Sequence, residues 1–216
     1  MNIPISALFT LIFFSAIAQK QDDWKITKQE GDIKIYMRKS DESRFKEVMG
    51  TMQVNSNLGA LVYLVKDTKN HYKWIYANKN AEMLKSVNDF EWYYYNVSEA
   101  PWPVSNRDVI THAIMWQDKN TYKVTINSVG APDYIPKKKD LVRIPRILTS
   151  WEFTPLGKNL VEVRFKLAID LGGDIPAWLV NLAVDKGPFN TMSNMAKLIQ
   201  SGTARNVNLS YIKEKY

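Results

Sequence analysis

The chain has 216 residues, of which 45% are hydrophobic, and this size and content fit one domain with a substantial core. It contains no cysteine, which excludes disulfides, thiol nucleophiles, thiolate metal sites and thioether-linked lipid anchors. The formal net charge of +7 suits a nucleic acid or an anionic membrane surface as partner, or serves only to solubilise the surface.

The first residues are typical of a secretory signal peptide. An apolar run covers residues 3–16, and Ala16-Ile17-Ala18 has the small residues that signal peptidase recognises. The run is shorter than the roughly 20 apolar residues of a membrane-spanning helix. We therefore expect residues 1–18 to be cleaved and the protein to be exported, to a periplasm or outside the cell. Export favours a membrane surface over a nucleic acid as the partner of the positive charge.

Strands dominate the predicted secondary structure. Segments rich in β-branched and aromatic residues predict strands over residues 24–28, 33–39 and 45–54, and further strands between residues 82 and 170. Apolar residues at helical spacing predict one or two short helices within residues 58–76. From Val161 to Ile169, apolar residues alternate with polar and charged ones, which indicates a strand with one buried face.

A long helix is predicted near the C-terminus, from about Pro176 to Gln200. Because proline lacks an N–H group and clashes with the preceding turn, we expect a kink at Gly187-Pro188. The apolar stripes on the two sides of the kink are Trp178, Leu179, Leu182 and Ala183, then Phe189, Met192, Met195, Ala196 and Ile199. The order of elements predicts an α+β domain in which this helix covers a curved antiparallel sheet, with a C-terminal tail over residues 202–216.

The sequence shows no recognisable catalytic or metal-binding motif. The histidines, His71 and His112, have no neighbour at metal-ligand spacing, and no nucleophile elbow, zinc-protease motif or glycine-rich phosphate loop occurs. His71 is expected on a helix surface and His112 in a strand. We therefore predict no metal, no cofactor and no nucleic-acid partner, while carboxylate pairs for hydrolysis stay an open alternative.

Two segments are apolar on both faces, FEWYYYNV (residues 90–97) and VITHAIMW (residues 109–116). One face can lie under the helix. The other face would belong to a dimer interface, contact an outer helix layer or line a cavity for an apolar ligand, and ordinary core packing is the simplest interpretation.

Four segments resemble the START domain (steroidogenic acute regulatory protein-related lipid transfer) family in sequence and in order. They are NHYKW, FEWYYYNVSEAPWPVSNRDVI, LVRIPRILTSWEFTPLG and VRFKLAIDLGGDIPAWLVN. The resemblance extends from about Trp24 to Ile199. It implies a helix-grip fold, in which a curved antiparallel β-sheet wraps around a long C-terminal helix and leaves an internal apolar tunnel for one lipid. Residues 19–201 would form this START-like lipid-binding domain.

The resemblance also implies a lid over the tunnel, formed by residues 98–106 beside the C-terminal helix. Two prolines restrict this loop, while Trp102 and Val104 would offer apolar surface to a lipid or a membrane, unless Trp102 fills the local core. Arg107 and Asp108 would anchor the loop as an ion pair or a hydrogen-bond network. We expect the loop and the helix kink together to gate lipid release.

Strand parity and the helical stripe predict which residues line the tunnel. They are Trp92, Tyr94, Val109, Thr111, Ala113, Met115, Phe189, Met192 and Met195. Several sterol-binding members of the family have a charged pair in this wall, but the corresponding residues here are Tyr94 and Ala113. A polar head group would therefore contact Tyr94, Thr111, Asn127 or Arg107.

Two functions follow from this sequence. The first is a non-enzymatic lipid-binding or lipid-transfer protein that works as a monomer and contacts membranes transiently. The second is a cyclase-type or hydrolase-type enzyme of the wider fold that acts on an apolar substrate. The scarcity of histidine and the absence of cysteine favour the lipid carrier. Lys137, Lys138 and Lys139 form either a solvated turn or a contact with an anionic membrane.

Overall fold

The computed structural model describes residues 23–39, 46–176, 178, 180, 184, 186–202 and 207–216. The predicted signal peptide therefore lies outside the described residues. So does most of the predicted C-terminal helix before Gly187, including Leu179, Leu182 and Ala183 of its first apolar stripe.

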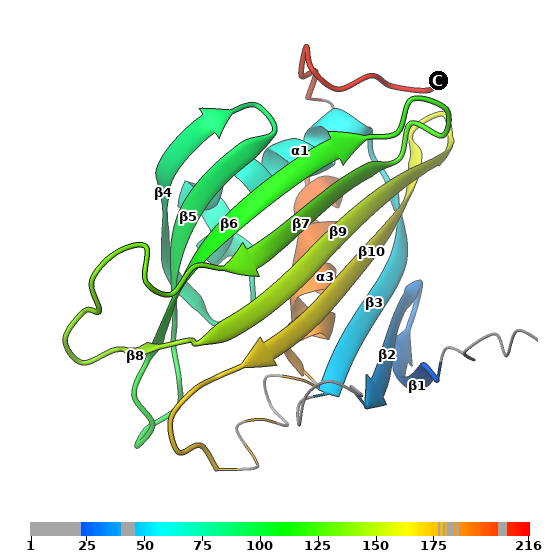
Figure 1. The fold of residues 1–216 in the computed structure, drawn as a ribbon. Helices are drawn as coiled ribbons and strands as arrows, with labels where there is room; N and C mark the ends of the chain where they lie inside the picture. The colour runs from blue at the N-terminus through cyan, green and yellow to red at the C-terminus, as the bar shows by residue number, and fades with distance from the viewer. Residues whose placement is uncertain are drawn as a thin grey trace, which may run out of the picture.

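A single curved sheet dominates the described part of the chain (Figure 1). Its strands are β1 (Lys25–Glu30), β2 (Ile33–Lys39), β3 (Lys46–Asn55), β4 (Asn78–Asn88), β5 (Glu91–Ser98), β6 (Arg107–Gln117), β7 (Val124–Gly130), β8 (Val142–Arg143), β9 (Arg146–Gly157) and β10 (Leu160–Asp170). The strand order is β1-β2-β3-β10-β9-β7-β6-β5-β4, with every neighbouring pair antiparallel, and β8 pairs with β6 in parallel. The predicted α+β architecture is confirmed.

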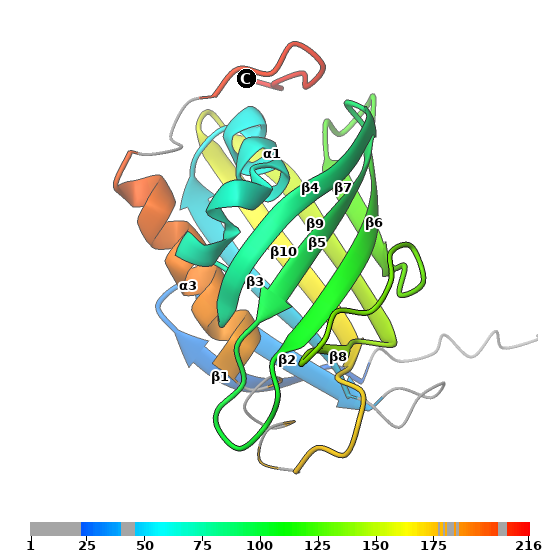
Figure 2. The ribbon, with the colours of Figure 1, turned by 90° about the vertical axis from the view of Figure 1, so that its left-hand side faces the viewer.

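The helices lie on the concave side of the sheet (Figure 2). Those with fully described limits are α1 (Leu58–Lys66), the 3-10 helix η1 (Thr68–Lys73) and α3 (Gly187–Gln200). The Asn57 side chain caps α1 by accepting a hydrogen bond from the Ala60 N–H at 3.2 Å. No described helix is both long enough and apolar enough to cross a membrane.

Helix α3 packs against β2 and β3 through the stripe that contains Met192 and Met195. A side chain at Gly50 in β3 would place its Cβ 2.1 Å from Sδ of Met192, so this glycine permits the close approach of helix and strand. Pro188 lies in the first turn of α3, where its missing N–H leaves no helical hydrogen bond unmade. Lys186, directly before Gly187, also has α-helical backbone angles, and most residues before it lie outside the described ones, so the kink at Gly187-Pro188 stays a prediction.

Residues 207–216 pack on the domain, which corrects the prediction of a tail. The Glu214 carboxylate accepts hydrogen bonds from the N–H groups of Leu58 at 3.0 Å and Gly59 at 2.9 Å, at the N-terminus of α1. The Lys213 N–H donates to the Gln117 side chain at 2.9 Å, and Ile212 is buried in the core. The physical reason is that free N–H groups at a helix N-terminus bind a carboxylate well.

Candidate functional site

A cavity of about 460 Å³ lies under one half of the concave face. Its wall comes from β4, β5, β6, β9 and β10, from residues 75–77 and 99–101, from Ile144 and Leu171, and from Thr191 of α3. Most of the wall is apolar, and the apolar residues include Val109, Ile144, Ile147, Leu167, Ile169 and Leu171. Ligand pockets in proteins typically measure about 300–1,000 Å³ and have such walls. The cavity therefore has the size and surface of a site for an apolar small molecule.

Three aromatic rings form the inner boundary of the cavity, and we call Tyr94, Trp151 and Phe165 the aromatic floor. Trp151 and Phe165 stack with ring centroids 4.2 Å apart, and Trp151 contacts the buried Trp74 behind it at 5.7 Å. Burial raises the pKa of the Tyr94 phenol, and hydrogen bonds with Ser128 and Thr111 partly offset this rise. The floor is therefore a neutral surface that separates the cavity from the packed core.

A polar row borders the opposite end of the cavity, next to the loop of residues 99–106. Asn78, Ser98 and Arg107 are cross-strand partners on β4, β5 and β6, and all three line the cavity. The Arg107 side chain donates through Nη1 to the carbonyl oxygen of Ser105. Burial lowers the pKa of Arg107, but arginine keeps its charge in proteins. The row therefore brings a cation, an amide and a hydroxyl to one end of an apolar space.

The structure divides the residues predicted to line the tunnel between the cavity and the packed core. Tyr94, Val109 and Thr111 line the cavity, and so does Arg107, which was predicted as a head-group contact. The other predicted wall residues are buried in the packed core instead: Trp92, Ala113, Met115, Phe189, Met192 and Met195. The reason is that α3 packs its apolar stripe onto β2 and β3, while the deep part of β5 and β6 is filled by large side chains. At the end of the stripe, Phe189 packs under Lys28 of β1, whose Nζ lies 3.4 Å from the ring centroid.

The remaining predicted contacts fall outside the cavity wall. Asn127 is exposed on the convex face, because neighbouring residues of a strand point to opposite sides and Ile126 points inward. Trp102 is 91% exposed, which contradicts a role in the local core, and Val104 is half-buried outside the cavity wall. Within the same loop, Ala100 and Pro101 line the cavity. One short loop thus presents one surface to the cavity and another to solvent.

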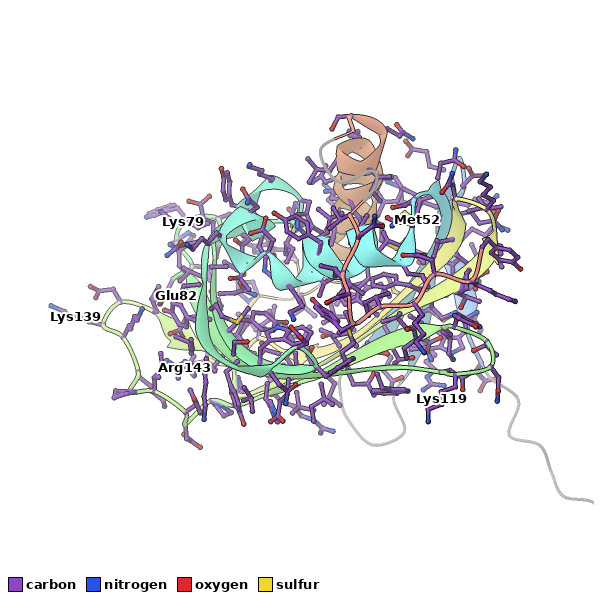
Figure 3. All side chains as sticks on the ribbon, turned by 90° about the horizontal axis from the view of Figure 1, so that it is seen from above. Met52, Lys79, Glu82, Lys119, Lys139 and Arg143 are labelled. Atoms are coloured by element: carbon purple, nitrogen blue, oxygen red, sulfur yellow. The ribbon has the colours of Figure 1, made fainter. Side chains whose placement is uncertain are left out.

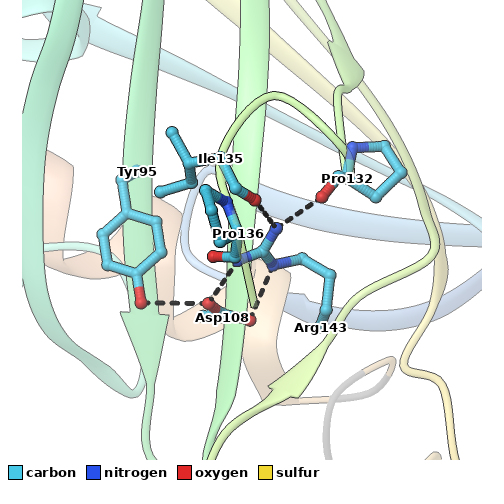
Figure 4. A network of polar contacts seen from close by, with 6 residues as sticks. All are labelled: Tyr95, Asp108, Pro132, Ile135, Pro136 and Arg143. Atoms are coloured by element: carbon cyan, nitrogen blue, oxygen red, sulfur yellow. Dashed lines mark hydrogen bonds and ion pairs between the residues drawn. The ribbon is translucent and has the colours of Figure 1, made fainter. Parts of the chain in front are cut away.

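Asp108 anchors this end of the sheet, but its partner is Arg143 and not Arg107 (Figure 4). Arg143 donates through Nε to Oδ1 and through Nη2 to Oδ2 of Asp108, each at 2.9 Å. The Tyr95 hydroxyl donates to Oδ2 at 3.0 Å, and burial together with this carboxylate raises the pKa of Tyr95. Arg107 directly precedes Asp108 in β6, and successive side chains of a strand point to opposite faces, so Arg107 points to the other face of the sheet.

Arg143 also holds the loop that follows β7. Its guanidinium donates to the carbonyl oxygens of Pro132, Ile135 and Pro136 (Figure 4). Lys137–Lys139 follow at once and are exposed, and Lys139 projects away from the sheet (Figure 3). Val142 then donates its N–H to the carbonyl oxygen of Asn106 at 3.0 Å. The lysine loop and the loop of residues 99–106 therefore lie at the same end of the sheet.

His71 is buried, which corrects the prediction of a helix-surface position. Its Nε2 lies 3.0 Å from the carbonyl oxygen of Val65, and its ring contacts Trp74 and Tyr94 at centroid distances of 5.5 and 5.8 Å. Burial lowers the pKa of His71. Among the described residues, no group of three or more histidine, aspartate or glutamate side chains is placed to hold a metal ion.

Comparisons with known proteins agree with this architecture. A model of the START domain family matches residues 9–205. An uncharacterised protein of Pseudomonas aeruginosa is 30% identical over 194 residues, which cover 89% of this chain and 95% of that protein. The phosphatidylcholine transfer protein of Mus musculus is 25% identical over 185 residues, which cover 83% of this chain and 85% of its own length.

Solved structures show the same fold. The crystal structure of a STAR-related lipid transfer protein from Xanthomonas axonopodis is 31% identical and superposes with a TM-score of 0.76, over 83% of this chain and 99% of its own. Human StAR-related lipid transfer protein 5 reaches the same TM-score of 0.76 at 17% identity, over 86% and 90% of the two chains. The helix-grip fold class expected from the sequence is confirmed.

Proposed function

The chain belongs to the START domain family, and from this premise we propose that it carries one lipid in the cavity without catalysing a reaction. The observation that carries the proposal is the space of about 460 Å³ between an aromatic floor and a polar row, inside the fold of known lipid-transfer proteins. Its mainly apolar wall supports an apolar ligand, and the polar row supports an amphiphilic one.

The energetics of lipids in water explain the use of such a cavity. Exposing a lipid tail of about 16 carbons to water costs about 0.8 kcal/mol per CH₂, or roughly 13 kcal/mol in total. An apolar cavity removes most of this cost, because the tail never meets bulk water. The carrier has to open only when it touches a membrane.

The loop of residues 99–106 is the proposed gate of the cavity and the proposed membrane contact. Support comes from Ala100 and Pro101, which line the cavity, and from Trp102, which is exposed to solvent in the same loop. Tryptophan favours the interface between a membrane and water. The exposed lysines 137–139 lie at the same end of the sheet and would attract anionic lipids. A hinge at Gly187-Pro188, where the described part of α3 begins, is the second part of the proposed gate.

The export of the protein is a further part of the proposal. It is supported by the apolar run of residues 3–16 and by the cleavage pattern at Ala16-Ile17-Ala18. N-terminal sequencing of the protein from its native host tests it. A mature protein that begins at Gln19 is expected, and a protein that keeps residues 1–18 contradicts export by cleavage.

The lipid-carrier function is tested by solvent extraction of the purified protein, followed by mass spectrometry of the extract, and by transfer of a labelled lipid between vesicles. We expect about one lipid per chain and transfer above the rate of spontaneous exchange. A folded protein that contains no lipid and transfers none contradicts the proposal. Conversion of the bound molecule into a product would instead favour the enzyme alternative.

The basic loop has its own test. Replacing Lys137, Lys138 and Lys139 by glutamine should weaken binding to acidic vesicles more at low salt than at high salt, because salt screens the attraction between exposed charges. Vesicle flotation at two salt concentrations measures the difference. Unchanged binding at both would leave these lysines as a solvated turn.

A further inference from the structure

The polar row contains a buried cation whose charge is not balanced within the described chain. Arg107 is 5% exposed, its Nε has no hydrogen-bond partner, and its guanidinium makes no ion pair with any described carboxylate. Buried charges in proteins are normally paired, because the desolvation of an unpaired charge is costly. Arg107 therefore has the position and the charge to bind an anionic group.

The nearest acidic residues in the sequence are engaged elsewhere. Asp108 forms its ion pair with Arg143 on the other face of β6. Glu99 lines the cavity, but its carboxylate is largely exposed and lies 3.2 Å from Nζ of Lys79. Within the described residues no carboxylate pairs with Arg107, and an anionic group in the cavity can supply the partner.

Asn78 supports the same conclusion from the neighbouring strand. It is 9% exposed, and neither the oxygen nor the nitrogen of its side-chain amide has a hydrogen-bond partner. Buried polar side chains in native proteins nearly always have partners. Asn78 and Arg107 are both cross-strand partners of Ser98, so their polar groups without hydrogen-bond partners lie at one end of the cavity.

We propose that the ligand carries an anionic head group, a phosphate or a carboxylate, which binds to Arg107 and Asn78 beside the loop of residues 99–106. This inference rests on the proposed lipid-carrier function and specifies its ligand class. Guanidinium groups bind both phosphate and carboxylate oxygens through charge-assisted hydrogen bonds, and an amide N–H adds a further donor. The aromatic floor then receives the apolar tail.

The position of the row also sets the orientation of the ligand. Thr111, the cross-strand partner of Tyr94 in the floor, follows Arg107 by four residues along β6, about 13 Å at ~3.3 Å per residue. The head group lies at the gate and the tail points toward the floor. Opening of the loop therefore exposes the charged end of the ligand first.

The test uses the full-length mature protein after removal of bound lipid, with a fluorescent dye in the cavity and three competitors that share one tail. The competitors are dodecyl phosphate, laurate and the neutral alcohol dodecanol, at neutral pH. We expect one or both of the anions to displace the dye on the order of tenfold better than dodecanol. A preference for dodecyl phosphate indicates a phospholipid as the natural source of the head group, and a preference for laurate indicates a fatty acid.

Variants connect this preference to the polar row. In Arg107→Met, the preference for the anion should disappear while dodecanol still binds as in the native protein. Arg164→Met removes a partly exposed arginine of β10 that lies outside the cavity wall, so it is the matched control and should keep the preference. If Arg107→Met does not fold, Asn78→Leu serves as the second variant and should reduce the preference severalfold.

The outcomes separate the two proposals. Equal displacement by all three competitors overturns the anionic head group and leaves the lipid carrier intact. A preference for the anion that survives in folded Arg107→Met, or in Asn78→Leu if Arg107→Met does not fold, overturns the assigned site. Displacement by none of the competitors, together with no lipid in the native extract, overturns the lipid carrier itself.

Discussion

The concave face of the sheet has two halves, one filled and one hollow, that share the same strands. In the filled half, Ala113 and Met115 of β6 pack in the core with Trp92 and Met192. In the hollow half, Val109 and Thr111 of the same strand face a space of about 460 Å³. Side-chain packing therefore stabilises the fold in the filled half, whereas the hollow half leaves space that a ligand can fill.

Truncation in the filled half should have the largest effect on stability. Trp92 is 0% exposed, so Trp92→Ala should lower the free energy of unfolding by about 3–5 kcal/mol. Val109→Ala in the hollow half should cost only about 1 kcal/mol, because the cavity side of Val109 makes no contacts to lose. Urea denaturation of the lipid-free proteins measures both values. Equal losses would mean that the two halves are packed alike.

Removal of the ligand should destabilise the protein next most strongly. A ligand that binds only the folded state adds about 2.7 kcal/mol to the free energy of unfolding when its free concentration is a hundred times the Kd. Thermal unfolding of the protein before and after solvent extraction should therefore show a lower Tm for the extracted form. An unchanged Tm, with lipid shown to be present beforehand, would contradict binding to the folded state.

Enlarged side chains should destabilise the filled half and block lipid binding in the hollow half. Ala113→Trp would overpack the filled half and cost about 1–3 kcal/mol or more. Val109→Trp would occupy the cavity, cost less than about 1 kcal/mol and abolish lipid loading. Urea denaturation and the lipid content of each purified variant provide the comparison. A folded Val109→Trp protein that still carries a full complement of lipid would place the ligand elsewhere.

His71 lies between the two halves, and its titration should make stability depend on pH. Burial lowers the pKa of His71 in the folded state, against opposing contributions from Val65, Asn96 and Asp67, while the unfolded state titrates near 6.5. The unfolded state thus binds more protons below that pH, and stability falls with decreasing pH by up to about 1.4 kcal/mol per unit.

The matched variant for this prediction is His71→Gln, which cannot titrate. The slope of unfolding free energy between about pH 7 and pH 5 should be smaller in the variant than in the native protein. Parallel pH profiles for the two proteins would show that another group causes the acid sensitivity.

The smallest effect on stability is expected at the gate. Trp102 is almost fully exposed, so Trp102→Ala should change the free energy of unfolding by less than about 0.5 kcal/mol. Lipid transfer between vesicles should nevertheless slow severalfold, because the loop loses its anchor in the membrane. Trp116→Ala, an exposed tryptophan in the part of β6 beyond the cavity, is the control and should transfer at the native rate. Equal slowing in both variants would remove the special role of the loop.

Local sequence patterns predicted the elements of the fold well. The strand over residues 33–39 was predicted with its observed limits, because turn residues and apolar alternation are local signals. The loop before Arg107, which the family resemblance implied, was found within a residue of its observed limits. The same patterns failed to separate the filled half from the hollow half. Along β6, every second residue from Val109 to Met115 is suited to burial, and only the cover supplied by distant elements decides which of them meets a cavity.

Contacts between distant parts of the chain explain the other failures. Asp108 pairs with Arg143, 35 residues away, and the adjacent Arg107 was the partner suggested by the sequence. Glu214 caps a helix that begins at Leu58, so the last residues belong to the domain although no periodic pattern marks them. Asn127 was misplaced because its side of β7 depends on the pairing with β6 and β9.

A crystal structure of the protein purified with its own ligand tests the lipid-carrier proposal most directly. We expect continuous density for one lipid between Arg107 and the aromatic floor, with Met192 and Met195 still packed in the filled half. An empty cavity in a protein shown to contain lipid, or density on the convex face beside Asn127, would contradict it.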